Sequence, residues 1–524
     1  MRRLAICVCM LALLGIYHPA AAEEPTSRTN LTEFSLQEGR NTVMYATADQ
    51  PEEMQWGPTA LTVAPDGTFW ISNSYVNKLT HVSAEGSVLG TIDLKPYGAV
   101  GITDLKAMSY GLVALDGGSP HVAVLVLGYD GALVQRYPIP ASLERSITGL
   151  IAGQDGELYL EARGIVKYRL LSPDGSPSGA WVRGAILNGK TIIITPATRN
   201  RPRAGSIQVG DVVRNVWANN YLGGIRLLGI NSASNQPGGS FYVIVVDLAP
   251  NSSGFFRFDY TVRHYRADGR LLGVARFPIN QQYVNVAHPL AIAPDGSVYG
   301  LVTREDSARV IKLAFSSSLQ PLFPKGTVTT YSPTKTLGAY TSRSAIASRA
   351  WDYVNNSRYY TSTNISGTCG GRDAPRYLLS PGTYTGVAYD WGGWDTVSAY
   401  NYYLDRGYQA GDIAETNLDA ESCSRGVDCS GFVTRAWGRT DQKYYTATLP
   451  NISYTLPGPW SLETGDIMNQ PNSHVRLVNS VDGNGAFVWE STAYAGMDRV
   501  VYRYVPWTSF LQYQPRRYSY LSNP

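Results

Sequence analysis

The chain has 524 residues, with 44 lysines and arginines against 41 aspartates and glutamates, and 16% of its residues are charged. A chain of this length holds about two to four domains, and its near-neutral balance excludes the basic surface of a nucleic-acid or anionic-membrane binder. The low charged fraction, with many tyrosines and glycines, favours a β-rich exported protein.

The first 22 residues resemble a signal peptide. Arg2 and Arg3 precede an apolar run over residues 4–16, and small alanines end at Ala22, where we expect cleavage. The run is too short to span a bilayer as a helix. We therefore expect a secreted or periplasmic mature protein without a transmembrane segment, and an uncleaved anchor is the alternative. Loss of Arg2 and Arg3 lowers the formal charge from +3 to +1.

Residues 23–325 read as repeated β-hairpins. The pattern apolar-x-x-Ala-Pro-Asp-Gly occurs at 61–67 and again at 290–296, and strands of alternating polarity flank both copies. Weaker Asp-Gly turns lie at 128–131, 152–156, 172–175 and 266–269. Units of roughly 40 residues are typical of propeller blades.

We expect five to seven blades and favour six, although residues 184–235 carry no clear turn motif. A pair of β-sandwiches is the competing fold. The loops around a propeller funnel favour ligand binding by this half, and a scaffold role has equal weight because a fold does not define a function.

A linker rich in Thr, Ser, Pro and Gly is predicted over residues 326–341. A helix is then expected over 342–355, because Ile346, Ala350 or Trp351, and Val354 recur on one face. This helix opens the second predicted domain, residues 342–524.

The segment 426–438 reads Gly-Val-Asp-Cys-Ser-Gly-Phe-Val-Thr-Arg-Ala-Trp-Gly and predicts a short helix. Asp428 is a good N-cap, Gly438 follows the C-terminus, and apolar residues recur at helical spacing between them. Cys429 therefore falls in the first turn, where the helix dipole favours a nucleophilic thiolate. The alternative is a buried, inert cysteine.

A cysteine nucleophile needs a base, and histidine suits that role at neutral pH. Of the six histidines, His474 alone lies beyond residue 300, in a segment that alternates as a strand. A hairpin turn at 481–485 then leads to the segment 486–492. If the two strands pair, Glu490 is the best group to orient His474, and Asp482 or Asn484 are alternatives.

Three cysteines remain after signal cleavage, at positions 369, 423 and 429. An odd number in an oxidising compartment predicts one disulfide and one free thiol. We expect a bridge between Cys369 and Cys423, which leaves Cys429 free. A regulatory bridge between Cys423 and Cys429 is the rival pairing.

Four ordered motifs resemble the NlpC-type cell-wall cysteine peptidases, a papain-like family. They are Tyr-Asp-Trp-Gly-Gly at 389–393, Asp-Cys-Ser-Gly-Phe-Val at 428–433, Gly-Asp-Ile-Met at 465–468, and His-Val at 474–475. The resemblance covers roughly residues 342–524. It implies a small antiparallel sheet packed on the helix that carries the nucleophile, and cleavage of peptidoglycan stem peptides, usually beside D-glutamate.

The same resemblance implies that Tyr389 lines the substrate pocket near the oxyanion and that Asp428 and Ser430 help to recognise the stem peptide. The chain departs from the family in three places. Glu490 stands where most members have histidine or another polar residue, and Arg476 replaces a small residue. The segment between the first two motifs is also unusually long.

The sequence therefore predicts an all-β propeller followed by an α+β papain-like domain, acting as an exported cysteine peptidase or amidase. Cys429, His474 and Glu490 are the predicted catalytic residues. No cofactor is expected, and a lone histidine without a ligand cluster predicts no metal site. The alternatives are an inactive cell-surface binding protein, and an amidase or acyltransferase on another substrate.

Overall fold

The computed structural model describes residues 31–46, 54–232, 236–327, 341–367, 369–413 and 422–522. The predicted signal peptide and most of the predicted linker, residues 328–340, lie outside these ranges. Within them, no helix has both the length and the apolar character that crossing a bilayer requires.

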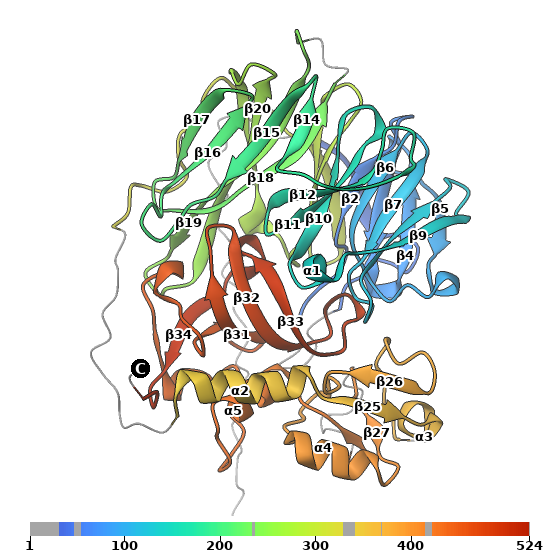
Figure 1. The fold of residues 1–524 in the computed structure, drawn as a ribbon, viewed down its shortest axis with the longest axis vertical. Helices are drawn as coiled ribbons and strands as arrows, with labels where there is room; N and C mark the ends of the chain where they lie inside the picture. Colours follow the sequence, from blue (N-terminus) through green and yellow to red (C-terminus); the bar gives the residue numbers. More distant parts are fainter. Residues whose placement is uncertain are drawn as a thin grey trace, which may run out of the picture.

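The N-terminal part is a propeller of six four-stranded antiparallel sheets in the described residues (Figure 1). Five blades are consecutive in sequence: β2–β5 (Leu61–Val63, Phe69–Asn73, Lys78–Val82, Val88–Asp93), β6–β9 (Ile102–Met108, Gly111–Asp116, Ala123–Leu127, Leu133–Pro138), β10–β13 (Ile147–Ala152, Leu158–Ala162, Ile165–Leu171, Pro177–Trp181), β14–β17 (Ala185–Leu187, Lys190–Thr195, Ala204–Val209, Val212–Trp217) and β18–β21 (Tyr221–Asn231, Ser240–Pro250, Phe256–Arg266, Leu271–Phe277). A short helix, α1 (Ala141–Glu144), precedes β10. The prediction of six blades is confirmed, and the alternative of paired sandwiches is wrong.

The sixth blade joins distant parts of the chain. Its strands are β22 (Leu290–Ile292), β23 (Val298–Thr303) and β24 (Ser307–Lys312), and β1 (Leu31–Gln37) pairs antiparallel with β24 as the outer strand. The first strand of the described chain therefore closes the ring.

The predicted turns form where the sequence placed them. Gly67 joins β2 to β3 and Gly296 joins β22 to β23, both at a φ of 85°, a conformation that glycine adopts without penalty. The segment without a predicted turn also forms a blade, β14–β17. Its first hairpin turns at Asn188 and Gly189, both with positive φ, which is an Asn-Gly signal in the sequence.

The C-terminal part contains helices and one large sheet. The helices are α2 (Arg343–Val354), α3 (Ser362–Ser366), α4 (Val397–Leu404) and α5 (Cys429–Ala436), and two small sheets pair β25 (Ser357–Tyr360) with β26 (Gly382–Thr385) and β27 (Gln409–Ala410) with β28 (Ser424–Arg425). The six-stranded sheet has the order β29 (Ser453–Thr455), β34 (Gln514–Tyr518), β30 (Ile467–Gln470), β31 (His474–Val481), β32 (Gly485–Thr492) and β33 (Arg499–Pro506).

This sheet lies between the propeller and the helices (Figure 1). On one face, Leu477 and Trp489 join a buried cluster with α2 and α5. On the other, Val478 and Val488 join a cluster with propeller residues of β18–β24. Both faces of the sheet are therefore buried, and the propeller packs directly against it.

The cysteine pairing and the first helix of this part follow the sequence. Cys369 and Cys423 form a disulfide, and Cys429 is the free cysteine of the described residues. The prediction of that bridge is confirmed. Helix α2 begins at Arg343, and its N-cap Ser342 accepts a hydrogen bond from the backbone N–H of Ala345.

Candidate active site

Cys429 is the first residue of α5 and is fully buried. Helix α5 begins there because the Asp428 carboxylate accepts from the backbone N–H of Gly431 at 2.6 Å, which caps the first turn. The helix packs across β31 and β32. This places the sulfur at the positive end of a helix dipole beside the strands that carry His474 and Glu490.

Asp428 has a dense set of partners. Besides the cap, one of its oxygens accepts from Ser430 Oγ at 3.0 Å, and the other accepts from the backbone N–H of Gly392 at 3.1 Å and forms an ion pair with Lys443. Asp428 and Ser430 are both fully buried. These bonds hold the start of α5 against the segment that carries the Tyr-Asp-Trp-Gly-Gly motif, and substrate recognition by the two residues stays a prediction.

His474 and Glu490 meet across neighbouring strands. His474 Nε2 lies 2.9 Å from Glu490 Oε2, and both side chains are buried. Of the three candidates for the orienting group, Glu490 is the one that contacts the imidazole. Asp482 instead accepts from turn backbone N–H groups and pairs with Arg163 of the propeller, and Asn484 bonds the propeller backbone.

Two arginines complete the surroundings of Glu490. Arg476 Nε donates to Glu490 Oε2 at 2.8 Å, and Arg503 Nε donates to Oε1 at 2.6 Å. Burial raises the pKa of Glu490, but Arg503, Arg476 and His474 outweigh it, so its pKa lies well below the usual range. Glu490 is therefore ionised at neutral pH.

His474 is held neutral. Burial lowers the pKa of its imidazole, the hydrogen bond to Glu490 opposes that shift, and Arg476 lowers the pKa further. Because Glu490 accepts from Nε2, the proton of the neutral ring lies on Nε2, and the Nδ1 lone pair is left as the basic site.

Tyr513 lies beside this network, with the guanidinium carbon of Arg476 4.9 Å from the centre of its ring. Burial raises the pKa of its phenol, Arg476 lowers it, and the charge of Glu490 raises it further.

The backbone of Tyr389 lies next to the segment that precedes the nucleophile. Its backbone forms a bridge with Val427, two residues before Cys429, and its N–H donates to Asp498 O at 2.8 Å. Its side chain is buried. The predicted oxyanion role of Tyr389 stays a prediction.

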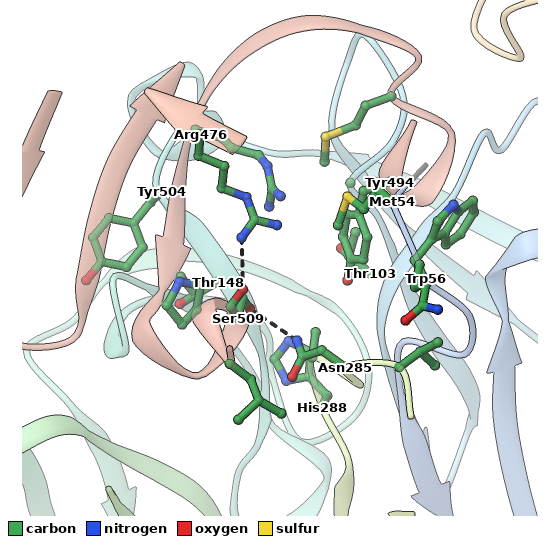
Figure 2. Close-up of a pocket in the computed structure, with 18 of the residues that line it drawn as sticks. Met54, Trp56, Thr103, Thr148, Asn285, His288, Arg476, Tyr494, Tyr504 and Ser509 are labelled. Atoms are coloured by element: carbon green, nitrogen blue, oxygen red, sulfur yellow. Dashed lines mark hydrogen bonds between the residues drawn. The ribbon is translucent and has the colours of Figure 1, made fainter. Parts of the chain in front are cut away.

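A cavity lies between the propeller and the propeller-facing side of the six-stranded sheet. We call it the interdomain cavity. Figure 2 shows residues from both parts around it, and its volume is about 150 Å³. The labelled lining residues are Met54, Trp56, Thr103, Thr148, Asn285, His288, Arg476, Tyr494, Tyr504 and Ser509.

Sequence reasoning missed Arg503, Lys443 and the propeller wall of this cavity. Arg503 lies in a strand that reads as an ordinary edge of alternating residues, and nothing local signals its contact with Glu490. In the described residues, no group of three or more histidine, cysteine or acidic side chains is placed to hold a metal ion.

No protein-family model matches the sequence, and no curated protein is similar to it. Several solved structures are weakly similar. A streptogramin B lyase has 13% identity and a TM-score of 0.28, covering 52% of this chain and 97% of its own. A virginiamycin B lyase from Staphylococcus aureus has 13% identity and a TM-score of 0.30, covering 54% and 99%. A gluconolactonase from Xanthomonas campestris has 13% identity and a TM-score of 0.28, covering 57% and 99%.

Proposed function

We propose that the chain is an exported cysteine hydrolase of the NlpC type that cleaves peptide or amide bonds in peptidoglycan stem peptides. The observation that supports it most is the 2.9 Å contact between His474 and Glu490, on strands packed against the helix that begins at Cys429. A free cysteine at a helix N-terminus and a histidine fixed by a carboxylate are the parts of a thiol-dependent hydrolase.

In the proposed mechanism, His474 Nδ1 accepts the thiol proton and the Cys429 thiolate attacks the substrate carbonyl. The C–N bond then breaks, and Nδ1–H gives its proton to the leaving amine. A water molecule, deprotonated by Nδ1, hydrolyses the thioester and restores the thiol. Glu490 keeps Nε2 protonated throughout, and backbone N–H groups at the start of α5 stabilise the oxyanion.

The test compares variants on purified peptidoglycan, with new amine ends and released fragments measured by mass spectrometry. We expect Cys429→Ala and His474→Ala each to lower the rate at least a thousandfold, as removal of a nucleophile or its base does. His121→Ala, at an exposed propeller histidine, is the matched control and should keep full activity. Equal activity of Cys429→Ala and wild type would overturn the proposal.

A second candidate is a binding protein whose hydrolase site is inactive. The observation that favours it is the burial of Cys429 and His474, whose side chains are 0% and 1% exposed. Alkylation separates the two: an active thiolate should react with iodoacetamide with an apparent pKa below about 8.5. Wild-type protein that binds cell-wall sacculi but releases no amine ends would support the binding protein.

A further inference from the structure

The interdomain cavity has walls from both parts of the chain. Arg476, Arg503 and Tyr494 line it from the C-terminal part, and Thr148, Asn285 and His288 line it from the propeller. Its volume of about 150 Å³ is enough for a small polar group.

The floor of the cavity carries excess positive charge. Arg476 and Arg503 share one carboxylate, Glu490, and His474 beside them is neutral because its pKa is lowered by burial. Two guanidinium charges against one carboxylate leave one positive charge uncompensated. Glu144 is the one acidic residue that lines the cavity in the described chain, and Arg145, which follows it in sequence, adds a positive charge to the same lining.

The guanidinium of Arg503 also has N–H groups that are available to a ligand. Its Nε donates to Glu490, and within the described residues its two terminal nitrogens make no hydrogen bond. Its side chain is 19% exposed and borders the cavity. Two parallel N–H groups of a guanidinium match the two oxygens of a carboxylate.

The propeller wall adds neutral polar groups. Burial lowers the pKa of His288 to about 3, although Asp104 at 3.4 Å opposes the shift, so the imidazole is uncharged at neutral pH. Asn285 Nδ2 donates to Ser509 Oγ at 3.4 Å across the cavity (Figure 2). Asp104, behind His288, is neutralised by Lys106 at 2.7 Å. Asp104 is therefore compensated and adds no net negative charge to this wall.

We propose that the interdomain cavity binds a carboxylate of the substrate, held by the terminal nitrogens of Arg503 and walled by the propeller. The propeller thereby selects the substrate by the acidic group that fits beneath it. This inference deepens the proposed function, because it places the carboxylate on the molecule whose amide bond is cleaved.

The first experiment measures binding without catalysis. Cys429→Ala protein, as the full chain, is titrated by calorimetry with N-acetylglutamate and with N-acetylglutamine as the neutral isostere. We expect the acid to bind about ten- to a hundredfold more tightly, the ratio typical of a charge-assisted contact. Equal affinities would overturn the proposal, and so would inorganic phosphate binding more tightly than the carboxylate.

Variants then locate the site. Arg503→Gln should abolish the preference for the acid, and Arg503→Lys should reduce it while keeping the charge. Arg358→Gln is the matched control, because Arg358 is 13% exposed and paired with an acid, Asp405, yet does not line the cavity. A preference that survives in both Arg503 variants would overturn the assignment. If Arg503→Gln does not fold, the test uses Arg503→Lys and compares its binding of N-acetylglutamate and N-acetylglutamine with that of the parent protein.

These experiments can refute the carboxylate site and the proposed hydrolase activity independently. Acid-selective binding that depends on Arg503, without any peptide cleavage, would remove the proposed hydrolase and leave the carboxylate site in place. Cleavage with equal KM for peptides that carry the carboxylate or its amide would remove the carboxylate site and leave the hydrolase.

Discussion

Glu490 accepts hydrogen bonds from three side chains on two strands, His474 and Arg476 on β31 and Arg503 on β33. A buried carboxylate with these partners has both a structural and a chemical role. It compensates the charges of two arginines, and it fixes which imidazole nitrogen is basic. The departures of this chain from the resembled family, Glu490 and Arg476, are thus partners of one another.

Glu490→Gln should destabilise the fold by about 3–5 kcal/mol, because it leaves the buried guanidinium of Arg476 and the mostly buried one of Arg503 uncompensated. Urea unfolding at neutral pH measures the loss. Glu463→Gln is the control: Glu463 pairs with Arg343 and Arg517 but is 46% exposed, so its loss should cost less than about 1 kcal/mol. Equal costs for the two variants would contradict a buried charge network.

Asp390 makes the folding stability of the protein depend on pH. Burial raises the pKa of this carboxyl from 3.8 to about 8, and neighbouring Asp395 adds to the shift while a bond to Ser424 opposes it. The folded state therefore keeps a proton that the unfolded state has lost, so stability falls as pH rises from about 4 to 8.

The asparagine of Asp390→Asn cannot ionise, so this variant should not lose stability in the same way as the pH rises. We expect its stability relative to wild type to rise by about 2–5 kcal/mol between pH 5 and pH 9, measured by chemical unfolding at both values. Exposed Asp352→Asn on α2 should change stability by less than about 0.5 kcal/mol at either pH. A wild-type stability that stays constant from pH 5 to 9 would refute the prediction.

At the scale of elements, the start of α5 depends on one side chain. Asp428→Ala removes the cap and the buried ion pair with Lys443. We expect a loss of about 3–5 kcal/mol. Thr396→Ala, which removes the cap of α4 and no ion pair, should cost about 1 kcal/mol. Thermal unfolding compares the two, and a smaller cost for Asp428→Ala would contradict the role given to it.

The local signals for this helix and for several hairpins were strong enough to predict them. An N-cap, a helical apolar stripe and a terminal glycine all pointed to α5, and Glu490 was the best group to orient His474 if their two strands paired. The hairpin at Asn188 and Gly189 was missed, although an Asn-Gly pair favours the positive φ of a tight turn. Arg503 was not readable, because its partner lies on the neighbouring strand and no local pattern specifies it.

At the scale of the molecule, the contact between propeller and sheet was the feature that the sequence left open. Residues 486–489 read Ala-Phe-Val-Trp, an unbroken apolar run, and such a run indicates a strand covered on both faces. What covers the second face follows from tertiary packing alone. The propeller supplies that cover through β18–β24.

The fragment 341–524 should therefore fail to fold as a soluble monomer. Without the propeller, the face that carries Val478 and Val488 would be exposed to water. Expression of the fragment and of the full chain under the same conditions, followed by measurement of the soluble fraction, checks this. A soluble fragment with native-like near-ultraviolet circular dichroism would show that the two parts are independent.

The pairing of β1 with β24 has a consequence for how the protein matures. The strand that starts the propeller stays unpaired until β24, at the far end of the ring, has been synthesised. During that interval its backbone edge is open to other chains. The nascent chain is therefore prone to aggregation until β1 pairs with β24 and the propeller ring is closed.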